Sequence, residues 1–257
     1  MTIGVFDSGV GGLTVLAALR RTLPEADLLY LGDTARVPYG SRSAATVASY
    51  SADCAGWLLD RGCEQLVIAC NTASAYGAET VRSLAGNRPV YEVVGAGAFA
   101  AARRGGDGGV AVLATRGTVG SGAYLSAIEA RLPGQAVRQV ACPLLVPIIE
   151  EGWYDHPALA SVLETYLGEL SGFDFDRMIL GCTHYPLIHD RIQEAVGASV
   201  AVIDSSEAIA EALRGSGLSR GTGRTELVFS DDPELSRHVV ERIFPYAVHR
   251  WEAVSWD

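Results

Sequence analysis

One stretch decides the fold: Leu66-Val67-Ile68-Ala69-Cys70-Asn71-Thr72-Ala73-Ser74. Its β-branched apolar run ends in a cysteine, and the small polar residues that follow can begin a helix. A second segment has the same plan: Met178-Ile179-Leu180-Gly181-Cys182-Thr183-His184-Tyr185-Pro186. Open α/β sheets bind ligands in the crevice beyond the carboxyl ends of their strands. The two segments therefore direct two thiols toward such a crevice.

Strand patterns alternate with helix patterns along the rest of the chain, which is typical of an α/β fold with parallel sheets. The expected strands are 3–6, 28–31, 66–69, 90–94, 110–114, 137–141, 178–181, 200–203, 226–229 and 246–251. The expected helices are 13–23, 43–61, 73–84, 96–104, 124–132, 158–170, one from about 187, 205–214 and 233–243, with a loop through Glu150.

Equivalent strand ends recur at a nearly constant spacing. Thr115 follows Asp7 by 108 residues, Cys182 follows Cys70 by 112, and the ends of the next strands are 109 apart. Such a repeat predicts two pseudo-symmetric lobes, each an open parallel sheet, with the active site at their interface. The expected domains are residues 1–96 together with 205–257, and residues 97–204.

Composition narrows the classes of function. The chain has 257 residues, of which 49% are hydrophobic and 19% charged, as expected for a globular protein. All 20 basic residues are arginine, so neither a pyridoxal phosphate Schiff base nor a P-loop has its lysine. The net charge of -10 argues against nucleic acid as the main ligand.

The sequence also allows expectations about the cellular location of the protein and about disulfide and metal binding. No apolar run is long enough to span a membrane and no export signal precedes the first strand, so we expect a cytoplasmic protein. Five cysteines without a Cys-x-x-Cys pair argue against a disulfide framework. His184 and His189 are five residues apart with Pro186 between them, which does not fit a helical zinc site.

Two equivalent thiols indicate one kind of chemistry. A single cysteine at a strand end is more often a packing residue, but a pseudo-symmetric pair suits a reaction that is itself nearly symmetric. In stereoinversion one base removes a proton from one face of a carbon, and a conjugate acid delivers a proton to the other. We expect Cys70 and Cys182 to lie at helix N-termini, an environment that stabilises the thiolate.

Polar residues beside the two thiols can support such a reaction. The glycine-rich turn 7–12 between a strand and a helix resembles an anion cradle. Asp7, Glu150 and His184 are candidates for setting the protonation of the sulfurs. Donors that can bind carboxylates and stabilise a carbanion are Ser8, Tyr39, Asn71, Thr72, Thr115, Thr118 and Thr183.

Five blocks of sequence closely resemble the bacterial glutamate racemases, and they occur in the family's order over nearly the whole chain. They are residues 6–14, 32–40, 70–72, 142–152 and 181–186. The resemblance implies an isomerase that interconverts L- and D-glutamate without cofactor or metal. It also implies a supply of D-glutamate for peptidoglycan, and hence roles in cell wall biogenesis and cell shape. A homodimer is among the assemblies found in relatives.

The same resemblance assigns roles to residues. Cys70 would be the base for D-glutamate and Cys182 the base for L-glutamate. Asp7 would assist the first thiol, and Glu150 with His184 the second. The substrate-binding residues implied are Asp7, Ser8, Tyr39, Gly40, Asn71, Thr72, Thr115, Thr118, Thr183 and His184.

Three other functions compete with this interpretation. An aspartate racemase would use the same thiols with a pocket for a shorter side chain. A thiol hydrolase or amidotransferase would need only one of Cys70 and Cys182. A non-catalytic amino-acid-binding protein would bind glutamate without exchanging its α-proton.

Overall fold

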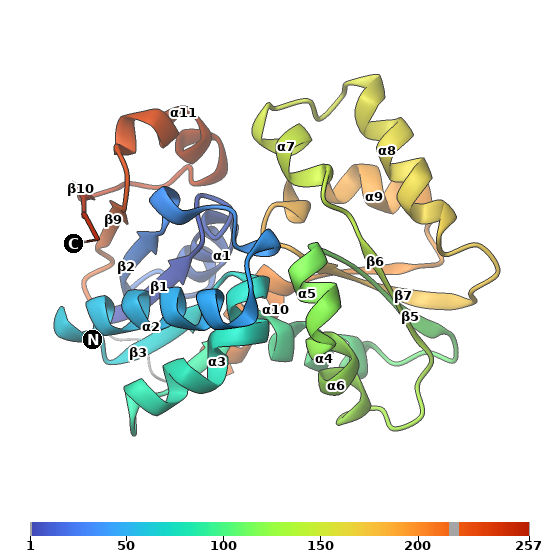
Figure 1. Ribbon diagram of the computed structural model, residues 1–257, viewed down its shortest axis with the longest axis horizontal. Coiled ribbons are helices and arrows are strands. Elements are labelled where there is room, and N and C mark those ends of the chain that lie inside the picture. The colour runs from blue at the N-terminus through green and yellow to red at the C-terminus, as the bar shows by residue number, and fades with distance from the viewer. Residues whose placement is uncertain (1, 216–220, 257) are drawn as a thin grey trace.

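The computed structural model describes residues 2–215 and 221–256, and Figure 1 shows their strands gathered into two sheets that lie side by side. The strands are β1 (Thr2–Asp7), β2 (Asp27–Gly32), β3 (Gln65–Ile68), β4 (Val90–Glu92), β5 (Gly109–Ala114), β6 (Val137–Ala141), β7 (Phe175–Gly181), β8 (Ala201–Asp204), β9 (Thr225–Phe229) and β10 (Arg250–Ala253). The α-helices are α1 (Leu13–Thr22), α2 (Ala44–Asp60), α3 (Asn71–Ala85), α4 (Val93–Arg104), α5 (Arg116–Ser121), α6 (Ala123–Glu129), α7 (Leu145–Glu150), α8 (Pro157–Gly168), α9 (His189–Val196), α10 (Ser205–Gly215) and α11 (Pro233–Ile243).

The order of strands repeats between the two sheets. The first sheet runs β10-β9-β2-β1-β3-β4 and the second β6-β5-β7-β8, with parallel pairing throughout. The segment β2-β1-β3-β4 thus corresponds strand by strand to β6-β5-β7-β8, and β9 with β10 extends the first sheet beside β2. The predicted class, two similar α/β lobes, is confirmed.

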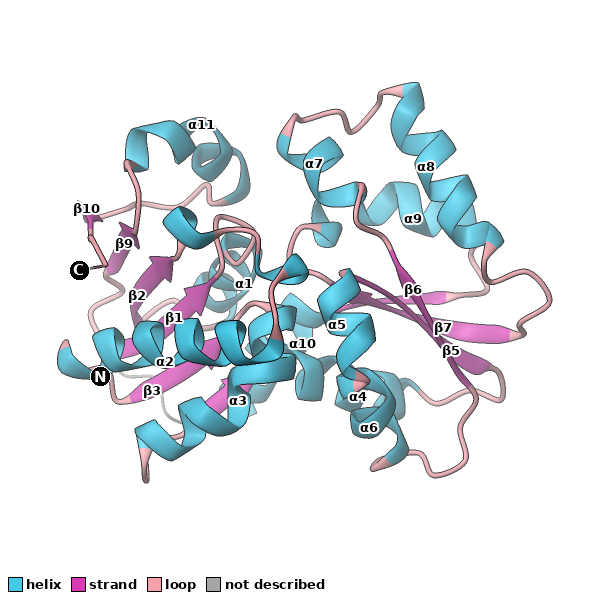
Figure 2. Cartoon of the chain, in the orientation of Figure 1, coloured by secondary structure: helices cyan, strands magenta, loops and turns pink. Residues whose placement is uncertain are grey.

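Both faces of each sheet are covered by helices, which explains the nearly continuous apolar strands. Val67 packs into one core of the first lobe with α1, whereas its neighbours Leu66 and Ile68 pack into the opposite core with α2. In the second lobe α7, α8 and α9 cover one face, and α4 and α6 cover the other (Figure 2). The helices cover the faces of the sheets, so a site can form only from the loops beyond the carboxyl ends of the strands.

The junction between the lobes contains α4 and α10. These helices pack on each other, α10 also packs on α1, and α4 also packs on α6 and β7. They therefore contact elements of both sheets, and the division at residues 96–97 and 204–205 stays a prediction. None of the helices in the described ranges is long and apolar enough to cross a bilayer.

Several expected elements were wrong in type or extent. The segment around Glu150 is helix α7, not a loop; Pro147 occupies the first turn, where a missing N–H disturbs no helical hydrogen bond. The strand expected at 90–94 ends at Glu92, whose carboxylate caps α4 by accepting from the Gly95 amide. Helix α5 was not expected, the helix expected at 124–132 spans Ala123–Glu129, and the last strand is 250–253 instead of 246–251.

Candidate active site

A cavity of about 300 Å³ lies between the carboxyl ends of the two sheets and is lined by both Cys70 and Cys182. Cys70 follows β3 and Cys182 follows β7, which occupy equivalent positions in their sheets. The predicted residues that line the cavity with them are Ser8, Tyr39, Gly40, Asn71, Thr72, Thr115, Glu150, Thr183 and His184. The strand repeat thus brings the two thiols to the wall of one cavity.

Cys70 is the N-cap residue of α3, as expected. Its sulfur accepts a hydrogen bond from the Ala73 amide at 3.4 Å and donates to the Ser8 hydroxyl at 3.6 Å. Burial nevertheless raises the pKa of the Cys70 thiol to about 12, and the nearby charge of Asp7 adds to the increase. The expectation of a stabilised thiolate is therefore wrong at Cys70, because desolvation outweighs the helix N-terminus.

Cys182 does not cap an α-helix, which corrects the second half of that expectation. A 3-10 helix at Tyr185–Ile188 follows it, and α9 begins only at His189. The polar partner of Cys182 is instead His184, whose Nδ1 lies 3.9 Å from the sulfur. The two thiols, equivalent in the fold, thus have different surroundings.

His184 connects Cys182 to a carboxylate. Its Nε2 lies 2.9 Å from Glu150 Oε1 on α7. Burial lowers the pKa of His184, but its hydrogen bonds to Cys182 and Glu150 outweigh burial and raise the pKa to about 10. His184 is therefore an imidazolium at neutral pH, held between a carboxylate and a sulfur.

Asp7 lies behind the cavity and does not line it. Its carboxylate accepts from the Gly9 amide at 2.9 Å and from the Thr183 hydroxyl at 3.5 Å, and burial raises its pKa. Thr14 makes a second link by donating to the Thr183 carbonyl at 2.9 Å. Asp7 therefore connects the end of β1 to the loop that carries Cys182.

The glycine-rich turn brings the lobes close together. A Cβ on Gly11 would lie 2.4 Å from Thr183 Oγ1 and 2.5 Å from the His184 ring. Gly40 also lies close to the second lobe, since its Cβ would lie 3.0 Å from the Thr115 Cβ. The absence of side chains here permits the close approach of the two lobes beside the cavity; that the turn also cradles an anion stays a prediction.

Two other predicted residues take positions different from those expected. Thr118 does not line the cavity: its hydroxyl lies 3.2 Å from that of Thr72 and 3.0 Å from that of Thr115. Tyr39 does line it, but its phenol hydroxyl is engaged as a donor to the buried Asp33 carboxylate. Thr118 thus acts as a support for two lining hydroxyls, and Tyr39 as part of the loop wall.

Several residues of the wall were not among the predicted site residues. They are Val37, Pro38, Ser41, Arg116, Cys142, Pro143, Val146 and Pro147. Arg116 directly follows Thr115, and the last four belong to the segment that contains Glu150, so proximity in sequence to a predicted residue was the available signal. Among the side chains that the structure describes, no group of three His, Cys, Asp or Glu could hold a metal ion.

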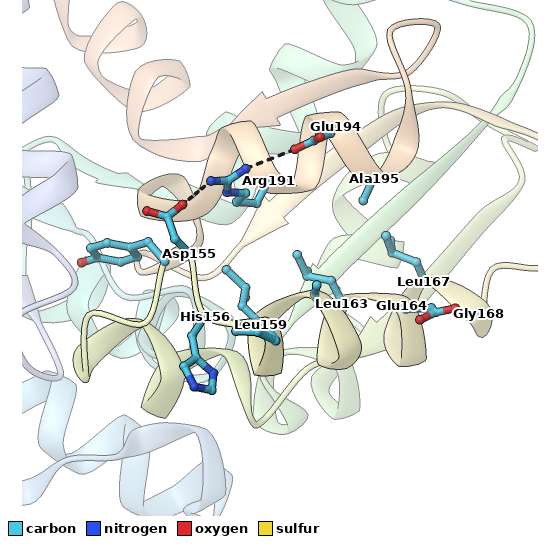
Figure 3. A pocket seen from close by; sticks show the side chains of 13 residues that line it. Asp155, His156, Leu159, Leu163, Glu164, Leu167, Gly168, Arg191, Glu194 and Ala195 are labelled. Carbon is cyan, nitrogen blue, oxygen red and sulfur yellow. Dashed lines mark hydrogen bonds and ion pairs between the residues drawn. The ribbon is translucent and has the colours of Figure 1, made fainter.

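A larger hollow of about 660 Å³ lies on the outer side of the second lobe, between α8 and α9. Figure 3 shows Leu159, Leu163 and Leu167 along it, with Arg191 paired to Asp155 and Glu194 at its edge. These ion pairs are exposed and contribute little, and no predicted site residue lies there. Size alone therefore does not identify the site, whereas the two thiols do.

Comparison with known proteins bears on the same site. A family model described as Asp/Glu/Hydantoin racemase matches residues 12–213. A glutamate racemase from Aquifex aeolicus is 44% identical over 243 residues, which are 95% of this chain and 94% of that protein.

Two solved structures are similar over almost the whole chain. The glutamate racemase of Francisella tularensis in complex with D-glutamate has a TM-score of 0.91 and 34% identity, covering 99% of this chain and 97% of its own. The glutamate racemase of Thermus thermophilus in complex with β-chloro-D-alanine has a TM-score of 0.87 and 42% identity, covering 99% and 96%.

Proposed function

Because the chain belongs to the Asp/Glu/hydantoin racemase family and is an amino-acid racemase, we propose that it interconverts L- and D-glutamate with Cys70 and Cys182 as paired acid and base. The observation that supports this most directly is the single cavity of about 300 Å³ lined by both sulfurs. The glutamate racemases of similar sequence and structure support the choice of substrate.

In the proposed reaction a thiolate removes the α-proton of bound glutamate from one side. The other residue, as a thiol, delivers its own proton to the opposite side, and each sulfur then exchanges its proton state with solvent. Cys70 acts on D-glutamate and Cys182 on L-glutamate, as the family resemblance implies. The equivalent placement of the two cysteines after β3 and β7 is consistent with opposite faces of one substrate.

The neighbours of each thiol would support its half of the reaction. On one side the His184 imidazolium, paired with Glu150, places positive charge 3.9 Å from Cys182. On the other, Ser8 bonds to Cys70, and the charge of buried Asp7 acts on the same thiol. No lysine is needed at any step, in keeping with a chain that contains none.

The substrate's carboxylates and amino group would be bound by neutral groups around the cavity. Ser8, Asn71, Thr72, Thr115 and Thr183 supply hydroxyl and amide donors, and the Tyr39-Gly40 segment contributes backbone. Asp7 and Thr118 would also position groups that bind the substrate, Asp7 through Thr183 and Thr118 through Thr72 with Thr115.

In the cytoplasm the racemase would supply D-glutamate for peptidoglycan, and would thereby act in cell wall biogenesis and cell shape. These roles, and assembly as a homodimer, rest on the family resemblance. Sedimentation of the purified chain tests whether it forms the homodimer.

Chiral chromatography of glutamate incubated with Cys70→Ala and Cys182→Ala tests the proposal. Loss of general acid-base catalysis should lower racemisation by about 10²- to 10⁴-fold in each variant. Cys63→Ala is the matched control, because Cys63 is equally buried but does not line the cavity. Full activity in either catalytic variant would contradict the two-thiol reaction, and faster turnover of aspartate than of glutamate would favour the aspartate racemase.

A further inference from the structure

The amide of Asn71 is only half satisfied. Its Oδ1 accepts a hydrogen bond from the Tyr124 hydroxyl at 2.7 Å, while its Nδ2 is buried and has no hydrogen-bond partner. The described residues contain two other buried side-chain atoms without a partner, on Arg20 and Gln139, and neither residue lines the cavity. Asn71 does line it and directly follows Cys70. An acceptor on the bound substrate would supply the missing hydrogen-bond partner of Asn71 Nδ2.

The partner of Oδ1 decides what the amide offers to the cavity. The two ends of an asparagine side chain have nearly the same shape, but one only accepts and the other only donates hydrogen bonds. A phenol that donates to Oδ1 leaves the NH₂ group as the end that meets a ligand. Burial raises the pKa of Tyr124 well above its usual value, so the phenol keeps its proton at any working pH.

Packing fixes Tyr124 in this position. The residue lies on α6 in the second lobe, is fully buried, and belongs to the core formed with α4 and β5. A Cβ on Gly97 would lie 3.3 Å from the phenol oxygen, and one on Gly181 would lie 3.0 Å from a ring carbon. Gly181 immediately precedes Cys182. Tyr124 therefore packs against the backbone before one thiol and bonds to the side chain after the other.

We infer that Tyr124 is a positioning residue for racemisation, which holds the Asn71 amide so that Nδ2 donates to a carboxylate of the substrate. The inference rests on the proposed function, because glutamate supplies the anionic acceptor. A carboxylate is the complementary group: Nδ2 would donate to it, whereas a flipped amide would present Oδ1 and repel it. Since Tyr124 and Asn71 come from different lobes, the bond also makes this donor dependent on the correct lobe arrangement.

The test is a double-mutant cycle with Tyr124→Phe and Asn71→Ala, measured as kcat and KM for L- and D-glutamate. Tyr124→Phe keeps the ring and its packing but removes the hydroxyl. Loss of one well-aligned hydrogen bond to a charged group corresponds to a fall in kcat/KM of about 10- to 100-fold. If Tyr124 acts through Asn71, the double variant has the kcat/KM of Asn71→Ala alone, because the two effects are not independent.

Tyr166→Phe is the control for loss of a buried phenol in the same lobe. Its hydroxyl accepts from the Leu144 amide and Tyr166 does not line the cavity, so we expect kcat/KM within about 2-fold of wild type. A melting temperature of Tyr124→Phe close to that of Tyr166→Phe would separate positioning from a general loss of stability.

The outcomes separate this inference from the proposed function. An active wild type whose Tyr124→Phe variant keeps its kcat/KM would refute the role of Tyr124 and leave the racemase proposal intact. Independent effects, in which the double variant loses the product of both single losses, would refute action through Asn71. A wild-type chain that does not racemise glutamate would overturn both.

Discussion

Replacement of Gly11 by alanine should impair catalysis far more than folding. The new Cβ would lie 2.4 Å from Thr183 Oγ1 and 2.5 Å from the His184 ring, whereas ordinary contacts are 3.4–4 Å. Relief of this overlap requires a displacement of about 1 Å between the glycine-rich turn and the loop after Cys182. A shift of that size at a reacting centre lowers turnover by about 10²-fold. Overpacking itself destabilises a protein by about 1–3 kcal/mol, or a few degrees in melting temperature.

Steady-state racemisation from both enantiomers, with melting temperature measured alongside, tests this prediction. The two enantiomers of glutamate have equal free energy, so kcat/KM must fall equally in both directions. Gly56→Ala is the matched control: this glycine lies within α2, and nothing lies within 4 Å of its Cβ position. Wild-type kcat/KM in Gly11→Ala, or an equal loss in Gly56→Ala, would refute the argument from close approach.

Three further predictions concern charge. Glu150→Gln removes one of the partners that raise the pKa of His184 from 6.5 to about 10. A raised pKa contributes its full stability below the pKa of the unfolded chain and none above the pKa of the folded chain. The difference in melting temperature between the variant and wild type should therefore be largest near pH 6 and vanish above about pH 10, and a difference independent of pH would contradict this. Asp33→Ala removes the carboxylate that accepts hydrogen bonds from four side chains, those of Arg36, Tyr39, Ser230 and Trp256. The free energy of unfolding measured by urea titration should fall by about 3–5 kcal/mol. An unchanged midpoint of urea unfolding would count against this role. Arg116 lines the cavity of a chain whose net charge is -10, so its positive charge should attract the anionic substrate. Arg116→Glu should lower kcat/KM by about 10-fold at low salt and much less near 0.5 M salt, where charges are screened. A loss of kcat/KM that does not depend on salt would exclude electrostatic steering of the substrate.

The sequence was most informative where a strand pattern ends in a reactive side chain. Cys70 and Cys182 follow buried apolar strands, and the repeat of about 110 residues predicted equivalent places for them in two sheets. Parallel strands bring their carboxyl ends to one edge, so the meeting of both thiols at a cavity followed from the pattern.

The surroundings of the thiols were less predictable, because they depend on burial and on contacts distant in sequence. The helix after Cys70 suggested a stabilised thiolate, yet desolvation reverses the sign of the pKa change. The segment through Glu150 was expected to be a loop, although the first turn of α7 tolerates Pro147 and the helix carries Glu150 to His184.

Tyr124 shows the limit of pattern reasoning most clearly. On an apolar helix face an aromatic residue is expected to be core, and its ring is indeed buried. Only the fold reveals that its hydroxyl reaches Asn71, 53 positions earlier in the chain. A single hydrogen bond between lobes leaves no periodic signal in the sequence.

Racemisation of L-glutamate in deuterium oxide, without added cofactor, would show whether two thiols act on opposite faces of one carbon. Proton NMR and chiral analysis at low conversion would follow the α-proton in both enantiomers. We expect D-glutamate to form with deuterium at the α-carbon while the remaining L-glutamate keeps its proton, because the hydrogen delivered comes from the second, solvent-equilibrated thiol. D-glutamate that retains the original proton, or an absence of exchange by folded protein, would contradict it.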